Sequence, residues 1–154
     1  MGTDLDDIDY AILAALQENA RHNTNAAISE RVGVSPSTVG KRIGHLESTG
    51  VVRGYSPDVD YERAGYPLEV IFSCTAPVTD RATFVRGLDD LDGVVNVRVL
   101  MTGTENVHIR VVGASKDDIT EVAGEIDELG FDVVDEILVR DEFDLPSVRF
   151  TRDD

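Results

Sequence analysis

The sequence predicts an α+β fold of two domains, and three observations predict it. Apolar residues recur at helical spacing through the first fifty residues, and a strand–helix–strand pattern occurs twice after residue 67. Between these parts, residues 57–67 contain two prolines and a glycine and read as a linker. We therefore expect a winged-helix-like helix-turn-helix domain over 1–56 and a βαββαβ, ferredoxin-like domain over 68–154.

Two helices are expected first. One begins with Asp6 or Asp7 as its N-cap, since acidic side chains stabilise a helix start, and it ends near Asn19. The next follows the polar cap residues 23–25 and ends near Val32. Their apolar residues would form the centre of a small helical core.

A tight turn then leads to a third helix. Gly33 stands where a left-handed residue commonly ends a helix. Ser35 is the expected N-cap, and Pro36 suits the first helical position because its missing N–H would have no helical acceptor there. Gly50 ends this helix, and residues 51–56 read as a strand. The expected buried stripe of the third helix is Val39, Ile43 and Leu46.

The second domain contains the repeated pattern. Each half ends its helix with a glycine, and Thr79 and Ser115 are matching N-cap candidates. Both helices should cover one face of a four-stranded antiparallel sheet. The expected elements are a strand at 68–76, a helix at 80–91, a strand at 94–101, a strand at 107–112, a helix from 116 or 117 to 129, and a strand at 131–140.

The other face of the sheet should also be covered. We place Val95, Val97 and Val99 there with Met101, because a solvated face would carry polar residues. A second subunit is the natural cover, which predicts a homodimer.

Charge and composition narrow the class of protein. The chain has 30 acidic and 14 basic residues, for a net charge of -16. Residues 20–56 nevertheless hold five basic residues against two acidic ones, which suggests a local anionic partner. The overall composition resembles that of proteins from organisms with molar salt in the cytosol.

Several classes are excluded or disfavoured. No run of about 18 apolar residues is present to span a membrane, and the N-terminal residues lack the features of a signal peptide. The single cysteine, Cys74, excludes a disulfide framework and a cysteine-based metal site within one chain, and it reads as a core residue. We expect a cytoplasmic protein without a metal or cofactor.

The helix-turn-helix predicts binding to double-stranded DNA. Its second helix would enter the major groove, and the face opposite the buried stripe offers hydroxyls, cations and an imidazole. A merely solvated face is the alternative; the glycine turn, the Ser-Pro start, the basic segment and the following strand favour DNA. Gly40 and Gly44 either permit a close approach or are tolerated at a cost of about 1 kcal/mol each. The predicted DNA contacts are Asn25, Ser35, Ser37, Thr38, Lys41, Arg42, His45 and Arg53.

The sequence resembles the Lrp/AsnC family, the feast/famine regulators of bacteria and archaea, with a halophilic archaeal composition. The resemblance is carried by LDDIDYAIL (5–13), ENAR (18–21), VGVSPSTV (32–39), RI (42–43), LE (46–47) and GVVRGY (50–55). It implies a transcription regulator whose C-terminal, RAM-type domain binds an effector and forms oligomers. It also implies dimers that commonly assemble to octamers, and a small effector, usually an amino acid, that tunes assembly or DNA affinity.

The family's effector loop typically reads Thr-Gly-Asp-Tyr-Asp, and this chain keeps only the first two residues of that pattern. The resemblance predicts effector contacts here, although a simple hairpin turn explains the glycine and asparagine equally well. If an amino acid binds here, Glu105 would meet its amino group, and exposed backbone N–H groups would meet its carboxylate. The predicted effector residues are Met101, Thr102, Gly103, Thr104, Glu105 and Asn106.

Two other functions are compatible with a fold of this class. Some tetrapyrrole decarboxylases share this fold, but such an enzyme would need His or Arg side chains grouped in the second domain. Only His108 of the three histidines lies there; His22 and His45 lie in the helical part. A ligand sensor without DNA binding is the other alternative. We expect no enzymatic activity.

Overall fold

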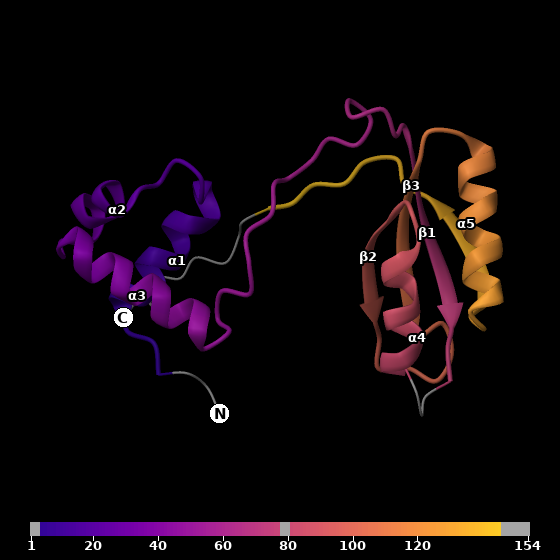
Figure 1. Cartoon of the computed structure of the whole chain (residues 1–154), viewed down its shortest axis with the longest axis horizontal. Coiled ribbons are helices and arrows are strands. Elements are labelled where there is room, and N and C mark those ends of the chain that lie inside the picture. Colours follow the sequence, from indigo (N-terminus) through magenta and orange to yellow (C-terminus); the bar gives the residue numbers. More distant parts are fainter. Residues whose placement is uncertain (1–3, 78–80, 146–154) are drawn as a thin grey trace. The chain divides into compact units, whose positions relative to one another are not determined.

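The computed structural model describes residues 4–77 and 81–145, the side chain of Arg81 excepted. The chain divides into two compact units, one built on the residues up to Pro57 and one formed by Asp58–Glu142. Figure 1 labels most of the helices and strands of both units. No helix among the described residues is long and apolar enough to cross a membrane.

The first unit contains three helices, α1 (Asp7–Asn19), α2 (Asn25–Val32) and α3 (Pro36–Ser48). Their starts confirm the predicted caps. Asp6 caps α1 in a reciprocal capping box with Asp9, and Thr24 caps α2. Ser35 caps α3 with Pro36 in its first turn, and Gly33 ends α2 at φ 81°.

One small core joins the three helices. Ile43, Val51 and Val52 pack at its edge. The predicted stripe of α3 is confirmed, with Val39 and Leu46 fully buried and Ile43 partly so. The fully buried side chains at its centre are Ile12, Ala15, Ile28, Val39 and Leu46.

The strand predicted for 51–56 is wrong. Residues 51–56 are not in a strand, and no strand pairs with them among the described residues. The Val52 N–H donates instead to the Leu46 carbonyl at 3.0 Å, which closes the end of α3. The two valines that suggested a strand are apolar because they pack on the helical core.

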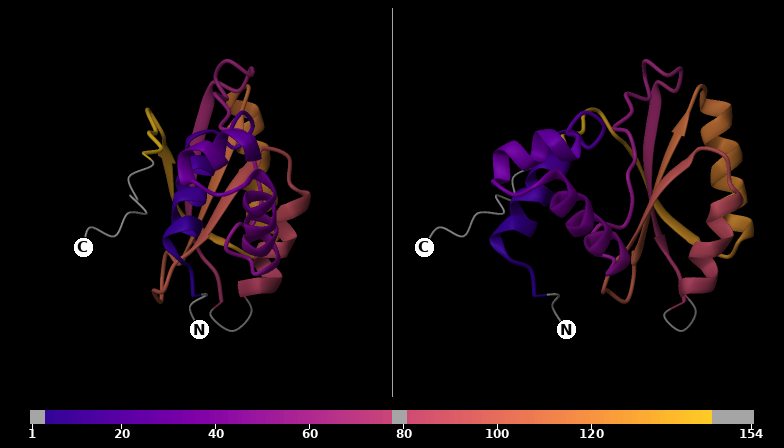
Figure 2. Two further views of the ribbon diagram at one scale, coloured as in Figure 1. Left: turned by 90° about the vertical axis from the view of Figure 1, so that its left-hand side faces the viewer. Right: turned by 60° about the vertical axis from the view of Figure 1, so that its left-hand side comes forward.

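The second unit is a four-stranded antiparallel sheet with two helices on one face (Figure 2). The strand order is β2-β3-β1-β4, which confirms the predicted ferredoxin-like arrangement. Ser115 caps α5 as predicted, whereas Thr79 and the predicted helix start at residue 80 lie outside the described residues. The elements are β1 (Leu68–Thr75), α4 (Arg81–Gly87) followed by a 3-10 turn (Leu88–Asp90), β2 (Val94–Val99), β3 (Val107–Gly113), α5 (Lys116–Glu128) and β4 (Asp132–Leu138).

Two valines of β2, Val97 and Val99, do not lie on the open face of the sheet. Val97 and Val99 pair with Ile109 and Val107, which are buried in the core beneath the helices. Antiparallel partners share a face, so both valines lie on the helix side, and Val95 falls at a register shift. The prediction that Val97 and Val99 lie on the open face is therefore wrong. The alternation of side chains along β2 separates its two faces, but only the pairing of β2 with β3 decides which of them is buried.

Candidate nucleic-acid interface and effector region

The start of α3 gathers three hydroxyl groups at an exposed helix end. Ser35 Oγ accepts from the Thr38 N–H at 3.2 Å and lies 2.9 Å from Thr38 Oγ1 and 3.2 Å from Ser37 Oγ. The cap thus orders the first turn while keeping the hydroxyls together. A helix N-terminus with clustered hydroxyls favours a phosphate or another anion.

Lys41 and His45 extend this surface along α3. Both side chains are exposed, and their spacing of four residues places them on neighbouring turns of one helix face. Arg53, another predicted contact, is also exposed, just beyond the end of α3. These placements agree with the predicted interface, although DNA contact by each residue stays a prediction.

Gly40 and Gly44 turn out to have different surroundings. A Cβ at Gly40 would lie 3.0 Å from Asn25 Nδ2, so the absence of a side chain lets the start of α2 approach α3 closely. Gly44 would meet nothing within 4 Å. Packing inside the unit therefore explains Gly40 and does not explain Gly44. Asn25, a predicted DNA contact, is exposed at this same helix contact.

Arg42 lies against α1. Its Nη1 is 2.6 Å from Asp6 Oδ2 and 3.1 Å from Asp9 Oδ1. The N–H of Asp9, and after it the guanidinium of Arg42, lower the pKa of Asp6 below its ordinary value. These hydrogen bonds also raise the pKa of Arg42, the one with Asp6 most strongly. Sequence reasoning missed the contact, because it placed Asp6 only as a helix cap and Arg42 on the outward face of the third helix.

The basic segment is partly neutralised by α1. Arg31 forms two hydrogen bonds with Glu18, at 2.7 and 3.1 Å, and Arg42 is paired as described. All of these carboxylates precede residue 20, where the predicted basic segment begins. Counted from the start of the chain to Pro57, the unit has seven acidic and five basic residues. Arg21, Lys41 and Arg53 are left without an acidic partner among the residues the structure describes.

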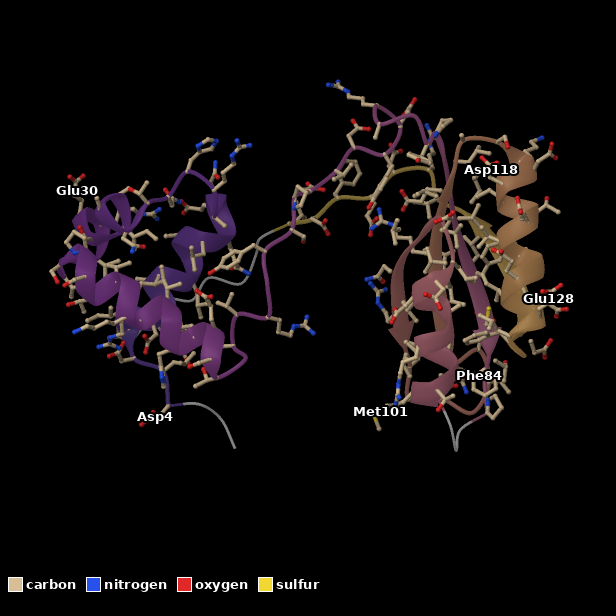
Figure 3. The ribbon with its side chains drawn as sticks, in the orientation of Figure 1. Asp4, Glu30, Phe84, Met101, Asp118 and Glu128 are labelled. Carbon is tan, nitrogen blue, oxygen red and sulfur yellow. The ribbon has the colours of Figure 1, made fainter. Side chains whose placement is uncertain are left out.

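The predicted effector loop is a closed turn between β2 and β3. The Leu100 N–H donates to the Asn106 carbonyl at 2.7 Å, and Thr102 Oγ1 donates to the Thr104 carbonyl at 2.8 Å. Met101 is fully exposed and extends away from the ribbon (Figure 3). Gly103 and Thr104 are exposed as well. The loop therefore presents side chains and backbone to solvent between two fixed ends.

The last two loop residues bind back to β1. Asn106 is fully buried, where its side chain accepts from the Ala76 N–H at 2.8 Å and donates to the Ala76 carbonyl at 2.9 Å. Glu105 has φ 48°, its N–H donates to Thr75 Oγ1 at 2.9 Å, and its carboxylate accepts from Ser73 Oγ at 3.3 Å. These contacts give both residues a structural role. Effector contact by either of them stays a prediction.

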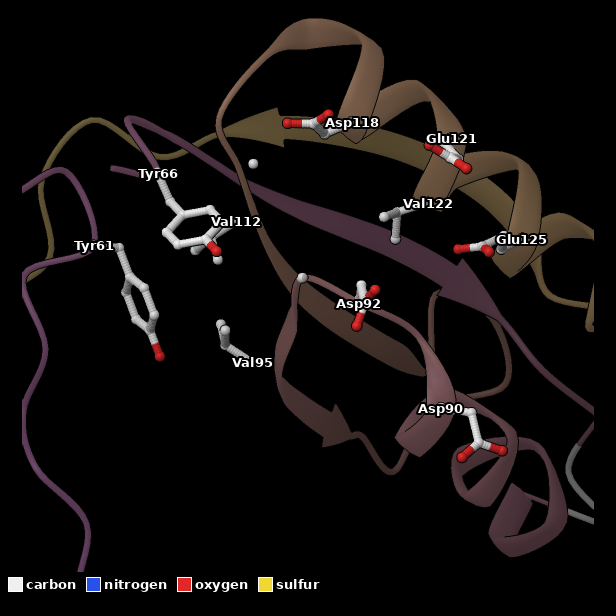
Figure 4. A pocket seen from close by; sticks show the side chains of 12 residues that line it. Tyr61, Tyr66, Asp90, Asp92, Val95, Val112, Asp118, Glu121, Val122 and Glu125 are labelled. Carbon is white, nitrogen blue, oxygen red and sulfur yellow. The ribbon is translucent and has the colours of Figure 1, made fainter. Parts of the chain in front are cut away.

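A cavity of about 650 Å³ lies elsewhere in the second unit (Figure 4). It opens beside the first residues of β2, whereas the effector loop follows the last residues of that strand. Tyr61 and Tyr66 line one side, with Val95 and Val112 near them. Sequence reasoning missed this cavity because its acidic residues are far apart in the chain. Its carboxylates are Asp90, Asp92, Asp118, Glu121 and Glu125.

The remaining reactive side chains have structural surroundings. His108 is half-buried on β3 and pairs across the sheet with Ser73 and Arg98. Burial raises the pKa of the Cys74 thiol to about 11, and the charge of Asp132 adds to the effect. Among the described residues, no three His, Cys, Asp or Glu side chains are arranged to hold a metal ion.

The three-helix unit with an exposed, polar α3 and the helix-covered sheet together define a helix-turn-helix protein with a ferredoxin-like second domain. The family described as winged helix-turn-helix DNA-binding matches residues 5–53. The transcriptional regulator AldR of Mycolicibacterium smegmatis is 33% identical over 119 residues, which cover 75% of this chain and 68% of AldR. The regulator LrpA1 of Halobacterium salinarum is 41% identical over 83 residues, 54% of this chain and 58% of LrpA1.

Solved structures extend the likeness over nearly the whole chain. The crystal structure of AldR from Mycobacterium tuberculosis has a TM-score of 0.75 and 26% identity, and the match covers 90% of this chain and 96% of that one. A complex of the Neisseria meningitidis regulator NMB0573 with L-Met has a TM-score of 0.76 and 25% identity, with 92% and 93% covered. Escherichia coli AsnC, at 23% identity and a TM-score of 0.76, shares the fold over 96% of this chain and 99% of its own. The chain belongs to the Lrp/AsnC family of helix-turn-helix transcriptional regulators.

Proposed function

We propose that this DNA-binding regulator reads the major groove with the outer face of α3. The observation that carries the proposal is the exposed surface formed by the hydroxyls at the start of α3 together with Lys41 and His45. Hydroxyls and an exposed lysine suit phosphates and base edges, and a helix N-terminus adds its partial positive charge. Arg42 is paired with Asp6 and Asp9. The proposed contacts are Asn25, Ser35, Ser37, Thr38, Lys41, His45 and Arg53.

The second domain supplies control in this proposal. Residues 1–56 form the DNA-binding domain, 57–67 the linker, and 68–154 the domain for effector binding and oligomerisation. The effector is an amino acid held at the loop 101–106, which is supported by the exposed tip of that loop and by the L-Met complex of a solved relative. The chain assembles as a homodimer and further to an octamer, acts in the cytoplasm and catalyses no reaction.

The acidic charge points to a salt-rich cell. The chain has a net charge of -16, and one relative belongs to Halobacterium salinarum. Mutual repulsion of so many carboxylates destabilises a folded chain in dilute buffer, and counterions reduce this repulsion. We place the protein in a halophilic archaeon and expect its melting temperature to fall when it is desalted. An unchanged melting temperature after desalting would contradict this placement.

The two lysines of the chain test the DNA interface as a matched pair. Lys41 lies on the proposed surface, while Lys116 begins α5 in the other domain. We expect Lys41→Met to weaken binding of a duplex enriched by the wild-type chain from a random pool. It should also lower the slope of log affinity against log salt by about 0.9, the share of one phosphate contact. Lys116→Met should change neither quantity. Equal behaviour of the two variants, measured by fluorescence anisotropy, would rule out this face of α3.

A thermal-shift screen of the twenty amino acids in high salt tests the effector site. The expected result is a ligand that raises the melting temperature of the wild type and of Glu121→Gln, but not of Thr104→Ala. The first variant alters the acidic cavity and the second alters the exposed loop. A shift lost in Glu121→Gln and kept in Thr104→Ala would move the site to the cavity. No shift with any amino acid would contradict an amino-acid effector.

A further inference from the structure

The guanidinium of Arg42 contacts the almost buried carboxylate of Asp9. Its Nη1 is 3.1 Å from Asp9 Oδ1, and only 6% of the Asp9 side chain is exposed. The same nitrogen is 2.6 Å from Asp6 Oδ2. A carboxylate is tolerated away from water when a cation and hydrogen bonds compensate it, and Arg42 supplies the cation here.

All four oxygens of the two carboxylates are occupied. Asp6 Oδ1 accepts from the Asp9 N–H at 3.0 Å, and Asp9 Oδ2 accepts from the Asp6 N–H at 3.1 Å. The other two oxygens accept from Arg42. The first turn of α1 and the middle of α3 therefore belong to one hydrogen-bonded cluster.

Leaving this cluster would be unfavourable for Arg42. A guanidinium that turned toward a phosphate would leave the Asp9 carboxylate desolvated without its cation. Lys41, the next residue along α3, has no such restriction. It is exposed and has no acidic partner within the described part of the chain.

We propose that Arg42 is a positioning residue of the DNA interface: it fixes α3 on α1 through Asp6 and Asp9, while Lys41 supplies the cationic contact to phosphate. The inference rests on the proposed function and deepens it, because it divides two adjacent basic residues between two roles. The orientation of α3 decides which base edges its outer face meets. Loss of Arg42 should therefore reduce selectivity for sequence, whereas loss of Lys41 should weaken all DNA alike.

The test measures the full chain with two duplexes, one enriched by the wild type from a random pool and one scrambled from the same bases. Arg42→Met should lower affinity for the enriched duplex about tenfold, the scale of a charged hydrogen bond, and leave the scrambled duplex unaffected. Its salt slope should not change. Asp9→Asn should show the same pattern of affinities and salt slope. The double variant Arg42→Met/Asp9→Asn should lose no more affinity than either single variant, since each removes the same contact between α3 and α1.

Lys41→Met is the matched control on the neighbouring residue. It should weaken both duplexes and lower the salt slope by about 0.9. Thermal melting identifies any variant unfolded at the assay temperature. In that case Arg42→Lys replaces Arg42→Met. Because it keeps a cation near Asp9, it should lower affinity for the enriched duplex by less than tenfold and leave the scrambled duplex and the salt slope unchanged.

Two results have distinct meanings. If Arg42→Met lowers the salt slope by about 0.9 while Asp9→Asn binds as the wild type does, Arg42 touches phosphate and the inference is overturned. If the wild-type chain binds neither duplex at any salt concentration, the DNA-binding function itself is refuted.

Discussion

The buried side chain of Asn106 is expected to stabilise the second domain, and replacing it tests how the loop 101–106 is anchored. Its amide pairs with both backbone groups of Ala76, at 2.8 and 2.9 Å. Asn106 is 0% exposed and Ala76 1% exposed, so water does not replace these bonds in the folded state. In Asn106→Ala, the Ala76 N–H and carbonyl both lose this partner.

The expected loss follows from the two groups left unsatisfied. Each buried donor or acceptor without a partner costs roughly 1–3 kcal/mol, which gives about 2–6 kcal/mol for the pair. We expect urea denaturation, followed by circular dichroism, to show this loss in the transition of the second domain. The transition of the helical domain should not move if the two unfold separately.

Thr104→Ala is the control for this variant. Thr104 lies in the same loop, its side chain is exposed, and only its carbonyl takes part in the hydrogen bond with Thr102. We expect a change within about 0.5 kcal/mol, as for most surface substitutions. If Asn106→Ala also cost less than this, the two hydrogen bonds would not anchor the loop, and the reasoning from their burial would be refuted.

Three more predictions concern other positions. Gly93→Ala should lower the free energy of unfolding in urea by about 2 kcal/mol or more, because Gly93 has φ 86° and a Cβ would lie 2.7 Å from the Val112 carbonyl oxygen. Gly103→Ala is the control, since a Cβ there meets nothing within 4 Å, and it should cost much less. Equal losses in the two variants would contradict this reasoning. Cys74, with its thiol pKa raised to about 11, should resist alkylation by iodoacetamide at pH 8 in the folded chain. The stability that its thiol contributes below its ordinary pKa should be lost as the pH rises through about 11. Rapid alkylation without unfolding would disprove the burial argument. Asp6, whose pKa is lowered by the Asp9 N–H and then by Arg42, contributes stability above its ordinary pKa of about 3.9 that is lost as the pH falls below it. Asp6→Asn should therefore reduce the fall in melting temperature between pH 6 and pH 3, and an unchanged fall would count against the pairing.

Local signals made the helices and their ends predictable. The caps Asp6, Thr24, Ser35 and Ser115 lie beside the N–H groups they accept from, so a short stretch of sequence contains the whole interaction. The repeat of strand, helix and strand likewise identified the ferredoxin-like domain, since each half shows the same order of strand-like and helix-like apolar spacing.

Contacts between distant residues were not predictable in the same way. Arg42 is separated from Asp6 by 36 residues, and nothing in its neighbourhood on α3 distinguishes a paired arginine from a free one. The open face of the sheet was misassigned because the pairing of Val97 with Ile109 depends on β3. The apolar residues 51 and 52 suggested a strand, yet they pack on the helices instead.

The pairing of charges changes how this regulator attracts DNA. The predicted basic segment depends on five cations, but Arg31 and Arg42 are already paired with carboxylates of α1 or its cap. Long-range attraction therefore has few sources in a chain of net charge -16. At about 0.1 M salt the Debye length is roughly 10 Å, and the acidic residues repel phosphates over that range; at about 1 M it is roughly 3 Å, and this repulsion nearly vanishes. Salt thus weakens the proposed phosphate contact of Lys41 and relieves the repulsion at the same time. These opposing trends predict a flatter salt dependence than the number of cations suggests. They leave recognition to the proposed short-range contacts of the hydroxyls, Lys41 and His45 on a correctly oriented α3.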